Sequence, residues 1–345
     1  MSVFETSGSG GLRQLGLAPM NRLGMTVPVA GETMAELPAV LDELAGAGYS
    51  DIWTSEVNAT DAFAPLLMAA QQTPQPRLGT SIAGVFSRSP ALMAMSALAV
   101  AELSDEPIYV GVGSSSQNMV EQWHGTPFVQ PYQRVRDTVR FLRAAFTGQR
   151  VTLHGGSFEI DGFRLARVPP HPPRILVAAL RPGMLRLAGR EGDGVVLNWL
   201  SPDDTARVVP IVLDRNPAAD VVARLFVVTG PDRQAARGLA RRMVTAYLNT
   251  GVYAEYQRWL GRGPALEAMW DAWQAGDRRG ALAAVPDSVI DELFLIGSPA
   301  EIRSGVAGYV RAGITIPVLA VLGPDRESIR KLSVELGRPD AEARA

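Results

Sequence analysis

Short apolar runs alternate with amphipathic stretches along nearly the whole of the 345-residue chain. The apolar runs predict strands that are covered on both faces, as in a parallel sheet. The stretches between them predict helices: Leu37, Val40, Leu41 and Leu44, for example, follow helical spacing and are followed by glycine. We predict eight strands, at 12–18, 51–54, 77–82, 108–112, 174–178, 194–198, 225–229 and 316–321.

Eight strand and helix repeats favour an α/β fold of the (β/α)8 TIM-barrel type over an open doubly wound sheet. Such a barrel needs only about 250 residues, so the surplus predicts insertions. Residues 150–165 alternate around a Gly-Gly pair and predict a β-hairpin insertion before the fifth strand. Residues 235–286 predict a helical insertion, because they are too many for one barrel helix. Trp259, Trp270 and Trp273 within it either line a substrate pocket or pack in a subunit interface.

The chain contains no stretch with the composition of an interdomain linker, so we predict a single domain over residues 1–345. The Ser/Gly-rich residues 1–11 are expected to be disordered, and they lack the features of a targeting segment. The longest uncharged run in an apolar region, 89–101, is too short to cross a bilayer. We therefore expect a cytoplasmic protein with no membrane partner.

The composition excludes several kinds of chemistry. A formal net charge of -2 gives no general attraction to nucleic acid. The chain has no Cys and only three widely spaced His, so we expect no metal site and no thiol nucleophile. Lys331 is the only lysine and lies in a polar region, which argues against a Walker A loop or a Schiff base. A chain with so few reactive groups depends on a bound cofactor for its chemistry.

The chemistry of a TIM barrel takes place at the carboxyl ends of its strands. Glu56 follows the second strand and is our catalytic candidate; the alternative is a solvated loop acid. The small residues that end the third strand would let a flat ligand approach the backbone, and the candidates there are Thr80, Ser81 and Ile82. His124 also lies near the predicted mouth, as either a base or a structural hydrogen-bonding group.

Two further strand ends offer hydrogen-bond donors to a phosphate. The loop after the fourth strand combines glycines with hydroxyls, and its candidates are Gly111, Gly113, Ser114, Ser115 and Ser116. After the fifth strand a helix is expected to start at an Arg-Pro pair, whereas three other helices start at Ser-Pro pairs whose serine can cap them. Either a ligand phosphate or water would then cap this helix. The candidates here are Ala178, Ala179, Arg181, Pro182 and Gly183.

Several short motifs occur in a characteristic order: Ala-Gly-Tyr-Ser-Asp-Ile-Trp at 47–53, Leu-Gly-Thr-Ser-Ile at 78–82, Arg-Ser-Pro at 88–90, Gly-Val-Gly at 111–113, Ala-Gly-Arg-Glu-Gly-Asp-Gly at 188–194, Ile-Gly-Ser-Pro at 296–299 and Ala-Gly at 312–313. Together they resemble the bacterial luciferase-like monooxygenase superfamily, and within it the deazaflavin-dependent branch that includes methylenetetrahydromethanopterin reductase. The resemblance runs from about residue 15 to residue 322 of this chain.

The resemblance implies a luciferase-like TIM barrel, usually a homodimer, that binds coenzyme F420, or FMN in other branches. It also implies a cis peptide at Ser81–Ile82 behind the cofactor ring. The cofactor phosphate would be held by residues 113–116 and 178–183. The implied activity is hydride transfer between reduced coenzyme F420 and a small-molecule substrate.

One departure from the family separates this chain from the deazaflavin-dependent sugar-phosphate dehydrogenases. Those enzymes carry Asp-His after the second strand and an acid after the fourth, where this chain has Glu56-Val57 and Ser116. We therefore expect a different substrate. Two alternatives stay open: an FMN-dependent monooxygenase that uses oxygen with a partner reductase, and a non-catalytic flavin-binding barrel.

Overall fold

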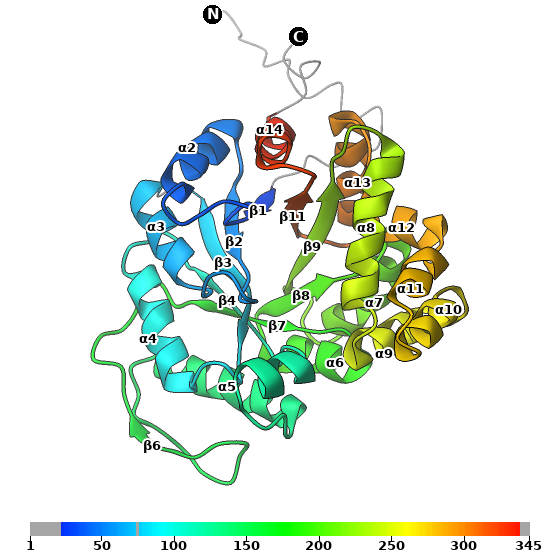
Figure 1. The fold of residues 1–345 in the computed structure, drawn as a ribbon. Helices are drawn as coiled ribbons and strands as arrows, with labels where there is room; N and C mark the ends of the chain where they lie inside the picture. The colour runs from blue at the N-terminus through cyan, green and yellow to red at the C-terminus, as the bar shows by residue number, and fades with distance from the viewer. Residues whose placement is uncertain (1–21, 74–75, 339–345) are drawn as a thin grey trace, which may run out of the picture.

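The computed structural model describes residues 22–73 and 76–338. Its parallel strands close into a ring, because the last strand pairs with both the seventh and the first. Helices surround the ring (Figure 1). The predicted (β/α)8 TIM barrel is confirmed. Its strands are β1 (Gly24–Thr26), β2 (Asp51–Thr54), β3 (Arg77–Gly84), β4 (Tyr109–Gly113), β7 (Arg174–Ala178), β8 (Gly194–Asn198), β9 (Asp220–Val228) and β11 (Ile316–Leu322).

The helices outside the barrel bury the apolar stripes that the sequence predicts. Leu37, Val40, Leu41 and Leu44 are all buried beneath the first helix, which ends at Gly48 in the left-handed conformation (φ of 99°). The outer helices are α2 (Leu37–Ala47), α3 (Ala64–Gln72), α4 (Pro90–Ala101), α5 (Pro131–Ala145), α6 (Pro182–Glu191), α7 (Pro202–Leu213), α13 (Pro299–Arg311) and α14 (Arg326–Gly337).

Most predicted strands are confirmed to within a few residues, but two predictions need correction. The first predicted strand, 12–18, lies outside the described residues, as do residues 1–11; the first barrel strand is β1. With three residues, β1 is too short to produce a recognisable hydrophobic pattern. The seventh strand begins at Asp220, not at 225, because Arg224 interrupts the apolar run on which the prediction rested.

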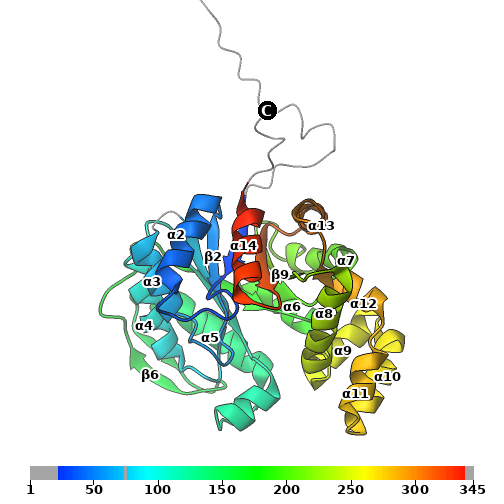
Figure 2. The same ribbon diagram turned by 45° about the horizontal axis from the view of Figure 1, so that its top comes forward.

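Both predicted insertions are confirmed. An antiparallel hairpin of β5 (Val151–Leu153) and β6 (Ile160–Phe163) precedes β7. The helical block follows β9, and Figure 2 shows α9, α10 and α11 grouped together at one side of the barrel. The elements of this region are α8 (Arg233–Tyr247), α9 (Gly251–Leu260), α10 (Gly263–Gln274), α11 (Arg278–Ala284), α12 (Asp287–Leu293) and β10 (Phe294–Leu295).

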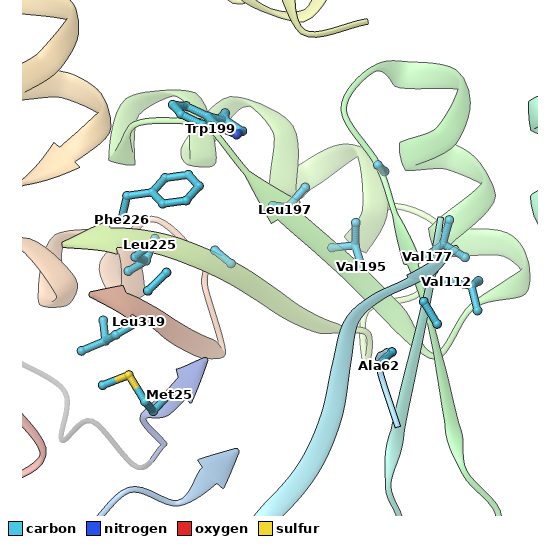
Figure 3. Packing of buried hydrophobic residues seen from close by; sticks show 14 of the residues in the cluster. Met25, Ala62, Val112, Val177, Val195, Leu197, Trp199, Leu225, Phe226 and Leu319 are labelled. Atoms are coloured by element: carbon cyan, nitrogen blue, oxygen red, sulfur yellow. The ribbon is translucent and has the colours of Figure 1, made fainter. Parts of the chain in front are cut away.

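Two sets of apolar side chains fill the fold. The larger set lies between the strands and the helices and includes Val177, Val195 and Leu225 (Figure 3). The smaller set fills the barrel interior around Trp53, whose ring would lie 2.5 Å from a Cβ at Gly79. Because this interior is packed, a ligand has room only at the carboxyl ends of the strands. The interior set is Trp53, Tyr109, Leu176, Val196, Val222, Ile316 and Val318.

Candidate active site

A cavity of about 1360 Å³ lies at the carboxyl ends of the barrel strands. Its walls come from the loop after β4 with the start of α5, the turn that leads into α6, and the end of α8 with the start of α9, and Trp273 of α10 adds to them. The helical insertion thus completes a wall that the strand-end loops begin. A space of this size accommodates a large cofactor.

Strand β3 carries a bulge near this cavity. Its pairing with β4 shifts register between Thr80 and Ala83, which places one extra residue in β3. The Ser81–Ile82 peptide within the bulge is cis, as the family resemblance predicts. Gly111 is needed opposite the bulge, because a Cβ there would lie 2.1 Å from the Thr80 carbonyl oxygen. Gly111 therefore makes room for backbone, not directly for a ligand.

The N-terminus of α6 presents free backbone donors to the cavity. Arg181, at its N-cap, makes no capping side-chain hydrogen bond, whereas Ser89, Ser201 and Ser298 cap α4, α7 and α13. Within the described residues, the exposed Arg181 side chain has no ion pair and no hydrogen bond. A Cβ at Gly183 would have nothing within 4 Å. Open N–H groups beside an unpaired guanidinium suit an anion.

The loop after β4 supplies hydroxyls to the facing wall. Ser114 and Ser116 line the cavity. Ser115 adopts the left-handed conformation (φ of 59°), and its hydroxyl donates to the sulfur of Met119 over 3.5 Å. Gly113 is buried behind them and does not line the cavity. The predicted loop is thus divided into residues that face the ligand space and residues that support them.

The predicted binding residues as a whole divide in the same way. Those that line the cavity are Ser114, Ser116, Ala178, Arg181, Pro182 and Gly183. Those that lie outside its lining are Thr80, Ser81, Ile82, Gly111, Gly113, Ser115 and Ala179. A direct role in cofactor binding stays a prediction for both groups.

Glu56 belongs to an ion-pair network and does not line the cavity. Its Oε2 accepts hydrogen bonds from Nε of Arg88 at 2.7 Å and from the backbone N–H of Ala62 at 3.1 Å. Its Oε1 accepts one from the Ser87 hydroxyl at 2.7 Å. Arg88 also pairs with Asp61 at 2.9 Å. These bonds anchor the loop after β2 to the start of α4, and a catalytic role for Glu56 stays a prediction.

His124 and the three tryptophans of the insertion occupy different environments. His124 is exposed after the π-helical turn Met119–Trp123 and does not line the cavity. Trp273 lines it, which matches the first of the two roles considered for these tryptophans. Trp270 is buried and donates its indole N–H to a backbone carbonyl, and Trp259 is partly buried against the core. Of these three tryptophans, only Trp273 is therefore available to a ligand in this cavity.

Sequence reasoning missed a polar group that β8 and β9 present on the interior face of the barrel, outside the lining of the cavity. Asn198 and Arg224 are neighbours in the strand register, and Nδ2 of Asn198 donates to the Tyr253 hydroxyl of α9 over 3.4 Å. Arg224 comes two residues after the inward-facing Val222, and Asn198 comes two residues after the inward-facing Val196. Because side chains alternate along a strand, Arg224 and Asn198 also lie on the interior face. A single charge at an inward position of an apolar strand is a signal that could have revealed this group.

The residues that the structure describes include no helix with the length and apolar character needed to cross a membrane. They also contain no group of three or more His, Cys, Asp or Glu side chains that could hold a metal ion. In this part of the chain, the polar side chains that line the cavity are hydroxyls, amides, the Arg181 guanidinium, the Trp273 indole and the carboxylates of Glu121 and Glu255.

The fold and the site define a TIM-barrel protein whose strand-end loops enclose a large, donor-lined cavity at the mouth. The chain belongs to the Luciferase-like monooxygenase family, whose model matches residues 14–315. The family predicted from the sequence motifs is therefore confirmed, and the protein is a member of an enzyme family.

The chain is similar to proteins that are named for coenzyme F420 or methanopterin. A protein of Mycobacterium tuberculosis assigned as a coenzyme F420-dependent oxidoreductase is 26% identical over 327 residues, which cover 87% of this chain and 93% of that protein. The 5,10-methylenetetrahydromethanopterin reductase of Archaeoglobus fulgidus is 28% identical over 305 residues, with coverages of 84% and 91%.

A solved structure extends the likeness to three dimensions. The coenzyme F420-dependent tetrahydromethanopterin reductase of Methanopyrus kandleri superposes with a TM-score of 0.73 at 21% identity, covering 91% of this chain and 97% of that one. At this identity the likeness is one of fold.

Proposed function

We propose that this protein is a coenzyme F420-dependent oxidoreductase that transfers a hydride between the reduced cofactor and an organic substrate. The observation that carries the proposal is the cavity at the mouth, where the uncapped start of α6, Arg181 and the β4-loop hydroxyls face one space. The name of the Mycobacterium tuberculosis relative supports coenzyme F420 over FMN.

The residues present suit such a cofactor by their chemistry. A phosphate needs several hydrogen-bond donors and positive charge, which the α6 N–H groups and Arg181 offer. The hydroxyls of Ser114 and Ser116 suit a polyhydroxyl chain. Ile82 of the β3 bulge is apolar and packs in the barrel interior, as the surface behind a flat ring should.

When bound, reduced coenzyme F420 supplies a hydride from C5 of its deazaflavin ring. The protein contributes position. Arg181 and the start of α6 hold the phosphate end, and the β3 bulge supports the ring, so that the reacting carbon points in one direction. The end of α8 and the start of α9 form one wall of the site. Glu56 stays the catalytic candidate of this proposal, beside its ion pair with Arg88.

Titration of the purified protein with coenzyme F420 and with FMN tests the proposal. We expect coenzyme F420 to bind in the cavity and FMN to bind more weakly, with fluorescence of the deazaflavin as the readout. Tight FMN binding without measurable F420 affinity would instead support the FMN-dependent monooxygenase. Binding of neither would support the non-catalytic barrel.

We further propose that the chain acts as one domain, as a homodimer in the cytoplasm, on a small-molecule substrate. Sedimentation equilibrium of the purified protein tests the dimer, and a single mass equal to one chain would contradict it.

A further inference from the structure

Arg224 places a guanidinium group on the interior face of β9, opposite the end of β8, and no carboxylate of the described residues pairs with it. It does not line the cavity itself, but Ala246 and Val252, next in the chain to Tyr247 and Tyr253, do. Its Nε atom is buried and has no hydrogen-bond partner. Within residues 22–73 and 76–338, no carboxylate pairs with Arg224, and its recorded contact is with the Phe226 ring, 5.4 Å from the guanidinium carbon. A partly buried cation with no partner is costly unless a ligand completes its surroundings.

The other buried arginine of this region has a full set of partners. Arg262 donates to Asp204, Glu292 and Gln257 at 2.5, 2.7 and 3.2 Å. Gln257 in turn donates to the carbonyl of Trp199 over 2.8 Å, next to the mouth. The fold therefore satisfies a structural guanidinium fully here, and the unpaired state of Arg224 stands out against it.

The surroundings of Arg224 are aromatic and weakly polar. Burial lowers its pKa, and the Tyr247 and Tyr253 side chains partly oppose that shift. Trp199 and Phe226 pack against each other with ring centroids 4.5 Å apart (Figure 3). The Arg224 guanidinium lies over the Phe226 ring. Tyr247 belongs to the same aromatic cluster and is 41% exposed, so the cluster has an accessible edge. An anion with an apolar body fits a cation that is bordered in this way.

The position of Arg224 in the barrel points to the substrate side of the site. In the ring of strands, β9 is four strands away from β3 in either direction, so the two face each other across the mouth. A flat cofactor that rests against the β3 bulge, as proposed above, turns its other face toward β9. The substrate must approach that free face to exchange a hydride.

We propose that Arg224, with Asn198 and Tyr253 beside it, binds the carboxylate of a hydrophobic organic acid as substrate; this rests on the proposed function. A guanidinium matches a carboxylate by two parallel hydrogen bonds. A single cation neutralises a monoanion, whereas a phosphate dianion would keep an uncompensated charge. The amide of Asn198 and the hydroxyl of Tyr253 offer further donors. The apolar part of the acid lies along the exposed edge at Tyr247.

Calorimetric titration of the F420-loaded protein with benzoate, with its neutral isostere benzamide and with inorganic phosphate tests this inference. We expect benzoate to bind about tenfold tighter than benzamide or more, the scale of a charge-assisted hydrogen bond. Arg224→Gln should abolish the preference, and Arg224→Lys should keep part of it. Arg242→Gln, an exposed arginine of α8, is the matched control and should leave the preference unchanged.

Several results would overturn the inference. Equal binding of benzoate and benzamide to the wild-type protein is enough by itself, even if the Arg224 variants fail to fold. If phosphate binds more tightly than benzoate and this binding depends on Arg224, the site binds phosphate and not a carboxylate. If Arg224→Gln loses F420 affinity and the wild type shows no preference for benzoate, Arg224 binds the cofactor and not the substrate.

The same titration on the cofactor-free protein separates this inference from the proposed function. If coenzyme F420 fails to bind but benzoate keeps its Arg224-dependent preference, the F420 function is overturned and the carboxylate site is supported. If coenzyme F420 binds and benzoate shows no preference, the reverse holds.

Discussion

The two ends of the barrel hold guanidinium groups in opposite surroundings. At the amino-terminal end of the strands, Arg22 pairs with Asp51, whose side chain is 0% exposed, and donates to the Tyr109 hydroxyl over 2.9 Å. At the mouth, Arg224 has no such partner within the described residues. The first end is closed by groups that satisfy one another. The second end leaves donors and space open, which is what a binding site needs before its ligand arrives.

Breaking the closed end should have the largest effect. Arg22→Met leaves the Asp51 carboxylate buried without its cation, and we expect the free energy of unfolding to fall by about 3–5 kcal/mol. Denaturant unfolding measures this change. Replacing both partners, as in Arg22→Met with Asp51→Leu, should restore much of the loss, because no isolated charge then remains. A loss below about 1 kcal/mol in the single variant would contradict the buried pair.

Two glycines differ in the space that is free for a side chain, and they test the contrast between the packed bulge and the open mouth. Gly111→Ala brings a Cβ against the Thr80 carbonyl, and we expect a loss of about 1–3 kcal/mol in the free energy of unfolding. Gly183→Ala is the matched variant at the mouth, where nothing lies within 4 Å, and should change stability little. Thermal unfolding of the two proteins makes the comparison. Equal shifts in Tm would mean that the mouth is packed as tightly as the bulge.

Removing the unpaired cation at the start of α6 should affect binding and not folding. We expect Arg181→Ala to weaken coenzyme F420 binding about tenfold, or about 1.4 kcal/mol, since one charge-assisted hydrogen bond is lost. Arg186→Ala, an exposed arginine on the same helix that does not line the cavity, is the control. Unchanged affinity in Arg181→Ala, or an equal loss in both variants, would move the phosphate away from this turn.

The smallest effect on stability is expected at Arg224. Arg224→Met removes a cation that has no counterion among the described residues, so the free energy of unfolding should stay the same or rise by up to about 1 kcal/mol. Chemical denaturation of this variant beside Arg22→Met gives the comparison directly. A loss as large as that of Arg22→Met would show that Arg224 supports the fold and is not reserved for a ligand.

Much of the fold can be read from the sequence because its signals are local. Ser298 caps α13, as expected for a serine that precedes proline at a helix start, and residues 150–165 form the hairpin around their Gly-Gly pair. The errors of the sequence-based prediction also have local causes. A three-residue strand such as β1 buries too few side chains to create a pattern. Arg224 made the predicted seventh strand begin at 225 instead of 220, because a charge within a buried strand is rare.

The site is less predictable, because its members come from strands and helices far apart in the chain. The uncapped start of α6 was visible from Arg181-Pro182, since capping depends on adjacent residues. The bonds of Glu56 to Ser87 and Arg88 were not, although they explain why a strand-end acid can be structural. The contribution of Trp273 and the α8–α9 wall likewise depends on how the insertion folds back over the mouth.

The sequence by itself located seven of the eight barrel strands and the two insertions, and it excluded a thiol nucleophile. These follow from periodicity, turn chemistry and composition, which need no knowledge of distant contacts. The family followed from the resemblance of the short motifs and their order. Only the tertiary structure decided which polar groups are satisfied. Arg22, Arg262 and Arg224 are alike as residues, and they differ because folding brings carboxylates to the first two and brings none of the described carboxylates to the third.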